Sequence, residues 1–234
     1  MSWIGEFWRS TLGKKAAMAV SGIVLFGYVL LHMIGNLKLY FPKYAEGPHQ
    51  GELPLNVYAG WLREVGGPML PHEGALWLVR IVLVVAVVAH VWAAWALTRA
   101  SRRARPRRYE NLQPVQVDYA DRTMRWGGVI ILLFVVYHIL HLTTGQAHTD
   151  FVPGDVYHNV VAGFSVWWVS AIYIAANLML GLHLYHGLWS MFLSLGWTHP
   201  TFNPWRRHFA VAFAVIVTAG NVSFPLAVLT GVVG

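Results

Sequence analysis

Five long apolar stretches constrain the fold of this chain more than any other feature. A helix crosses the roughly 30 Å hydrocarbon core of a bilayer with about 20 mostly apolar residues, since each residue rises about 1.5 Å. The stretches lack the period-two alternation of a membrane β-strand. They therefore predict an all-α membrane protein, a single domain over residues 1–234 that is a bundle of five transmembrane helices. The predicted spans are residues 16–41, 74–98, 126–143, 163–195 and 209–233.

The composition agrees with a membrane protein and narrows the chemistry. Only 12% of the residues are charged and the mean hydropathy is +0.49, whereas soluble domains usually carry about 25% charged residues. The first apolar stretch is too long for the core of a cleavable signal peptide, so we expect it to be retained as a span. The chain has no Cys, which excludes disulfides, thiolate metal sites and iron–sulfur ligation by this chain.

The positions of Lys and Arg predict the orientation. Thirteen of the 17 basic residues precede the first stretch, lie between the second and third, or lie between the fourth and fifth. By the positive-inside rule, the N-terminus is cytoplasmic and the C-terminus is outside. The run RASRRARPRR at 99–108 would also suit nucleic-acid phosphates. Topology and membrane lipid already account for it, so no nucleic-acid partner is expected.

Histidines within the apolar stretches point to a function. Ionisable groups in membrane spans are costly and usually functional. The five stretches contain no Asp or Glu, which argues against a proton pump or ion-coupled transporter, because these place carboxylates at depth. Imidazoles without carboxylates are typical of axial ligands to haem iron inside a helical bundle. The six histidines are His32, His90, His138, His141, His183 and His186.

Counting along the helices sorts these histidines by depth. His32 and His138 lie about 25 and 20 Å from the inner face, and His90 and His183 lie about 22 and 27 Å from the outer face. Two pairs at two depths predict a bundle that encloses two haem b groups, one in each membrane half. A packing role is the usual alternative for an isolated histidine. Spacing leaves two choices open, His138 or His141 and His183 or His186, because residues three apart share a helix face.

Four segments resemble the cytochrome b subunit of bacterial succinate dehydrogenase, the five-helix b558 type that also includes fumarate reductase anchors. The resemblance covers nearly the whole chain in the same helix order, and its most specific parts are H-x-x-x-N from His32 and H-x-x-x-G-L-W-S from His183. It implies that His32 and His138 bind the distal haem and that His90 and His183 bind the proximal haem. The segments are SGIVLFGYVLLHMIGNL, VVAHVWAAWALT, LLFVVYHILH and LHLYHGLWSMFLSLGW.

The resemblance also implies partners. A flavoprotein subunit with FAD would oxidise succinate, and an iron–sulfur subunit would relay the electrons; both would dock on the cytoplasmic side of the bacterial cytoplasmic membrane. This chain would pass the electrons through the proximal and then the distal haem b to quinone, usually menaquinone, as the quinone-reducing subunit of an enzyme of the tricarboxylic acid cycle. A higher oligomer of the complex is compatible with the sequence. In fumarate reductase relatives, a Glu of a proton path stands at the position of Gly181.

A quinone site needs hydrogen-bond donors and a proton source near one haem. The candidates in the outer half are Glu64, Glu73, Arg80 and His141. Haem propionates need cationic or hydrogen-bond-donating partners. The candidate partners are Arg80, Arg125 and His186. The alternative for each candidate is a purely structural position, in a solvated loop, between packed helices or against lipid. Two rival functions remain: the dihaem anchor of another dehydrogenase, such as a formate dehydrogenase or hydrogenase, and a non-redox transporter or scaffold.

Overall fold

Five long helices dominate the computed structural model, which describes residues 3–104, 116–197, 199–201 and 203–234, without the side chains of 4 and 116–123. Each long helix includes a segment that is long and apolar enough to cross a membrane. The prediction of an all-helical, multi-pass membrane protein is therefore confirmed for the described residues. The helices are α2 (Thr11–Asn36), α4 (Gly74–Ala104), α5 (Gln116–Leu142), α7 (Trp167–Ser194) and α8 (Asn203–Leu229).

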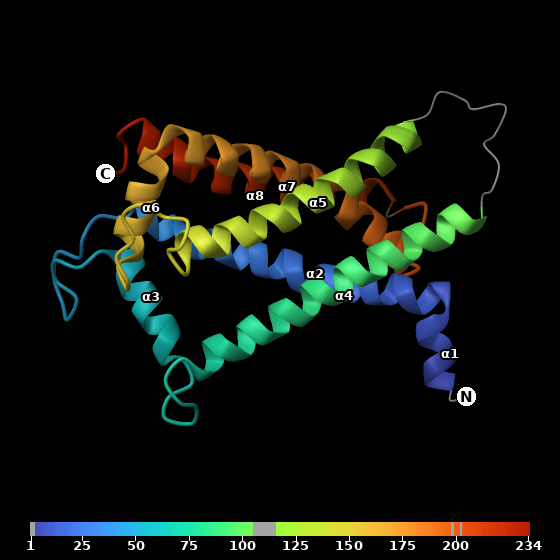
Figure 1. The fold of residues 1–234 in the computed structure, drawn as a ribbon, viewed down its shortest axis with the longest axis horizontal. Coiled ribbons are helices and arrows are strands. Elements are labelled where there is room, and N and C mark those ends of the chain that lie inside the picture. The colour runs from blue at the N-terminus through green and yellow to red at the C-terminus, as the bar shows by residue number, and fades with distance from the viewer. Residues whose placement is uncertain (1–2, 105–115, 198, 202) are drawn as a thin grey trace.

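The bundle has two distinct ends (Figure 1). We call the end with α3 (Pro54–Glu64) and α6 (Val156–Ser165) the loop end. We call the other end, with α1 (Trp3–Arg9) and the Arg-rich end of α4, the basic end. Arg105, Arg107 and Arg108 of the basic run lie outside the described residues, as does the side chain of Arg122.

The fourth span begins later than the sequence predicted. The predicted range 163–195 starts inside α6, and the chain is extended at Val166 before α7 begins at Trp167. Two serine hydroxyls donate to backbone carbonyls of α6: Ser170 to Phe164 at 2.6 Å and Ser165 to Val161 at 2.8 Å. Phe164 is one of the last four residues of α6, whose carbonyls have no partner within the helix, so the Ser170 hydroxyl satisfies one of these end carbonyls. The hydropathy pattern missed this break because both sides of it are apolar.

The long helices pack as two groups that contact each other. The principal contacts join α2 to α4, α5 to α7, and α7 to α8, and α2 also contacts α7 and α8. The α7–α8 pair is in close contact at Gly181, where an added Cβ would overlap with Oγ1 of Thr218. Small residues permit such close backbone approach between membrane helices. Thr218 of α8 therefore occupies the space that a larger side chain at position 181 would need.

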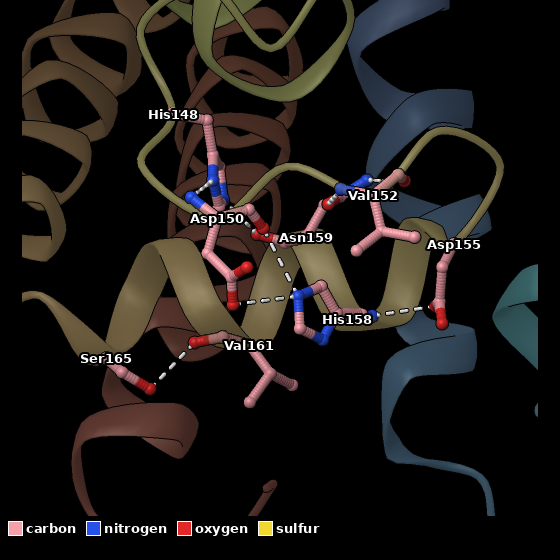
Figure 2. A network of polar contacts seen from close by, with 8 residues as sticks. All are labelled: His148, Asp150, Val152, Asp155, His158, Asn159, Val161 and Ser165. Atoms are coloured by element: carbon pink, nitrogen blue, oxygen red, sulfur yellow. Dashed lines mark hydrogen bonds and ion pairs between the residues drawn. The ribbon is translucent and has the colours of Figure 1, made fainter.

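A polar network holds the chain before α6 in place at the loop end (Figure 2). The Asn159 amide donates to the carbonyl of Val152 and accepts from its N–H, both at 2.8 Å. The Asp155 carboxylate caps α6 by accepting from the backbone N–H of His158 at 3.0 Å, and it accepts from Asn56 of α3 at 2.9 Å. The His158 N–H is the main cause that lowers the pKa of Asp155 below its ordinary value. The network thereby joins α3 to α6 next to the long helices.

Candidate functional site

Two of the predicted histidines face each other near the loop end. The rings of His32 on α2 and His138 on α5 have centroids 5.8 Å apart and are nearly perpendicular, at 87°. Each residue lies four positions before the end of its helix, which is about 6 Å along the axis. We call His32 and His138 the loop-end pair.

Two other histidines face each other deeper in the bundle. The rings of His90 on α4 and His183 on α7 have centroids 6.3 Å apart and an interplanar angle of 66°. Both residues lie near the middle of their helices. We call His90 and His183 the central pair. The two pairs are the ones that depth counting brought together from the sequence.

The spacing of both pairs suits one metal ion between the two rings. Imidazole nitrogens bind metal ions at about 2 Å, so two rings on opposite sides of one ion have centroids roughly 6 Å apart. Within the described part of the chain, no group of three or more His, Cys, Asp or Glu could hold a metal ion. Two protein ligands per site, rather than three or four, suit an iron whose other ligands belong to a porphyrin.

Hydrogen bonding prepares His90 to act as a ligand. The Ser21 hydroxyl lies 3.2 Å from Nδ1 of His90 and also 2.7 Å from the carbonyl oxygen of Ala17. A carbonyl only accepts, so the single serine proton goes to Ala17, and Ser21 Oγ accepts the Nδ1–H of His90. The neutral ring then carries its lone pair on Nε2. This is the tautomer that binds a metal through Nε2.

Glycines lie against the central pair. A Cβ added at Gly22 of α2 would lie 3.6 Å from Cε1 of His90, and one at Gly128 of α5 would lie 3.7 Å from Cε1 of His183. The Nδ1 of His183 is buried without a hydrogen-bond partner, although the backbone of Met124 lies near the ring. The two rings therefore rest on the backbones of neighbouring helices.

The remaining two histidines of the spans lie differently. His141 is buried, with 2% of its surface exposed, and its Nδ1 lies 3.0 Å from the Tyr173 hydroxyl. Its ring stacks on His148 with centroids 4.7 Å apart, so it does not face lipid headgroups. The His186 ring contacts the Tyr185 ring at 5.0 Å. The sequence left open the choice between His138 and His141 and between His183 and His186. The geometry favours His138 and His183, because only these two oppose another histidine on a different long helix.

The quinone-site candidates fall into separate places. Glu73 is bridged by Arg63 at 3.2 Å and Arg80 at 3.6 Å, and the Arg80 guanidinium also lies 4.8 Å from the Trp77 ring centroid. Glu64 is exposed and pairs with His72 at 3.2 Å. Glu73 and Arg80 therefore form one cluster at the start of α4, while Glu64 and His141 do not join it. Arg125 is exposed on α5.

Two residues beside the loop-end pair were not found from the sequence. Tyr28 stacks on His32 with centroids 5.5 Å apart and an angle of 19°. The Tyr173 hydroxyl lies 3.3 Å from Nδ1 of His138. A buried tyrosine hydroxyl usually has a hydrogen-bond partner, so a tyrosine inside an apolar span could have indicated a polar contact at Tyr173. Its partner depends on the register between α5 and α7, which one sequence does not contain.

The chain was also compared with known proteins. No family model, curated protein or solved structure matches it.

Proposed function

We propose that this protein is a dihaem membrane cytochrome b that carries electrons from a soluble partner to quinone. The observation that carries the proposal is the two histidine pairs, each contributed by two different long helices and each spaced for one iron. The His32 and His138 pair would hold the distal haem, and the His90 and His183 pair the proximal haem. Bound haem b supplies one-electron redox chemistry.

The surroundings of the pairs suit this role. No Asp or Glu lies in any of the five described spans, so no carboxylate competes for the histidines as an ion-pair partner. Ser21 keeps Nε2 of His90 available as a ligand. Apolar surroundings exclude solvent and help to set the potential of a bound haem. The chain's own contribution is to hold the ligands, choose their tautomers and keep the site dry.

The basic end favours docking of an acidic protein surface. Three parts of the chain that carry exposed basic residues, α1 with the start of α2, the end of α4 and the start of α8, lie at this end (Figure 1), and the Arg99 guanidinium lies 5.3 Å from the Trp95 ring centroid. Such charge attracts negatively charged lipid and partners. Under the positive-inside rule this end would be cytoplasmic, and the resemblance to the b558 type would place the chain in a bacterial cytoplasmic membrane. The exposed residues are Arg9, Lys15, Arg99, Arg102, Arg103 and Arg207.

The resemblance to the b558 type supports a more specific role. The chain would be the membrane anchor of a succinate:menaquinone oxidoreductase, bound to a flavoprotein subunit with FAD and to an iron–sulfur subunit. Quinone would bind near the loop-end pair, where the Glu73 and Arg80 cluster offers charged hydrogen-bonding groups at the membrane boundary. Arg80 would serve the distal propionates in that arrangement, and Arg125 the proximal ones.

Purification of the intact complex from its native membrane tests this role. We expect the chain to co-purify with a flavin-containing and an iron–sulfur-containing subunit, and succinate to reduce its haem bands, which a menaquinone analogue then reoxidises. Formate or hydrogen, added as matched alternative donors, should leave the bands oxidised. Reduction by formate or hydrogen but not succinate would assign the chain to another dehydrogenase and contradict the succinate role.

A further inference from the structure

The Tyr173 hydroxyl lies between two histidines of α5. It is 3.3 Å from Nδ1 of His138 and 3.0 Å from Nδ1 of His141. Tyr173 is buried, with 4% of its surface exposed, and its ring packs edge-on against Phe134 and Phe164 at centroid distances of 4.9 and 4.8 Å. The aromatic packing fixes the hydroxyl at this position.

The tyrosine has a single proton for these two contacts. A tyrosine hydroxyl donates one hydrogen bond and accepts others, and a neutral imidazole has one N–H and one lone pair. When one histidine donates its Nδ1–H to the tyrosine oxygen, the tyrosine proton is left for the Nδ1 lone pair of the other. A histidine that binds iron through Nε2 carries its proton on Nδ1, so His138 is the donor to Tyr173. The shorter contact, to His141, then receives the tyrosine proton, which matches the shorter distances of O–H donors.

We propose that Tyr173 is the positioning residue of the loop-end haem site, accepting the Nδ1–H of His138 while donating its own proton to Nδ1 of His141. The inference rests on the proposed dihaem function and adds a role that the four ligands do not explain. It also gives His141 a role. Because His141 accepts the tyrosine proton, Tyr173 does not donate to Nδ1 of His138, which would leave the His138 proton on Nε2, the atom needed for iron.

The arrangement has a redox consequence. An acceptor at Nδ1–H orients the ligand and raises its basicity, which favours the oxidised iron. Removal of the acceptor should raise the midpoint potential of the loop-end haem and weaken its binding, since loss of such partners typically costs about 10- to 100-fold in metal affinity. The central pair has a separate hydroxyl acceptor, Ser21, and should not respond.

Tyr173→Phe tests the inference, because it removes the hydroxyl and retains the ring. We expect a higher midpoint potential for one of the two haem components and its release to a haem acceptor protein roughly 10-fold faster or more. Tyr137→Phe is the matched control, because the Tyr137 hydroxyl is buried in the same aromatic cluster without a hydrogen-bond partner. This control should leave both components unchanged. The haem component assigned to the central pair serves as an internal control, because its unchanged potential shows that the Tyr173→Phe protein has folded.

A second variant, His141→Leu, removes the acceptor of the tyrosine proton. We expect it to perturb the same component as Tyr173→Phe, although His141 does not oppose another span histidine. Unchanged potentials and release rates in both variants, with two haems in the wild type, would overturn the inference and leave the dihaem function standing. A wild-type chain that binds no haem would overturn both. Equal shifts in Tyr137→Phe and Tyr173→Phe would show a packing effect and also overturn the inference.

Discussion

Replacing His183 with Ala should reduce the haem content from two per chain to one and remove a single component of the visible spectrum. His183 opposes His90 with ring centroids 6.3 Å apart, so in the proposed function its loss would leave His90 as the single histidine ligand of that haem. The loop-end pair is carried by α2 and α5 and shares no ligand with the central pair. Its component should therefore persist.

His186→Ala is the matched control for this prediction. His186 is on the same helix, three residues further along, and opposes no histidine on another long helix among the described residues. It should retain two haems, whereas His90→Ala should lose the same component as His183→Ala. The measurements are the haem-to-chain ratio and a potentiometric titration of the remaining bands. Loss of haem in His186→Ala but not in His183→Ala would contradict the assignment of ligands.

Gly181→Ala should destabilise the bundle strongly for a change of one methyl group. The new Cβ would overlap with Oγ1 of Thr218 and lie 3.3 Å from its Cβ, so the Thr218 side chain must rotate or α7 and α8 must shift. Overpacking of this kind typically costs about 1–3 kcal/mol. Thermal unfolding in detergent should show a lower midpoint temperature. Gly187→Ala is the matched control on the same helix, because nothing lies within 4 Å of its added Cβ, and it should be neutral or slightly stabilising.

A double variant tests the cause. Thr218→Ala removes the overlapping oxygen, so Gly181→Ala combined with Thr218→Ala should recover part of the lost stability, a positive coupling between neighbours. Purely additive losses would show that the contact is not the cause. The same contact bears on the b558 resemblance, because a carboxylate side chain at position 181 has no room against Thr218. Gly181→Glu is expected to disrupt packing rather than to supply a proton path.

The large-scale fold was predictable because hydropathy alone marks spans of this length. All five predicted stretches correspond to long helices, and depth counting placed His32 with His138 and His90 with His183, since a helix rises by a constant amount per residue. The start of α7 was not predictable in this way. The break is a single extended residue, Val166, beside the Ser170 bond to the Phe164 carbonyl, and it lies within an apolar segment.

The finer features of the site depend on contacts between helices. The bond from His90 to Ser21 and the contacts of Tyr173 need the rotation and register of each helix, which periodicity within one segment does not provide. The same limit applied to the quinone candidates. Glu73 and Arg80 lie together, but Glu64 lies on the surface with His72 and His141 lies beside Tyr173.

The haem content of the purified wild-type chain tests the central claim most directly. A dithionite-reduced minus oxidised spectrum, with haem extracted and quantified against protein, should show b-type bands and two haems per chain. His32, His90, His138 and His183 would then account for four axial ligands. A chain that folds as a monodisperse membrane protein, is supplied with haem during expression and yet binds none would contradict the dihaem function.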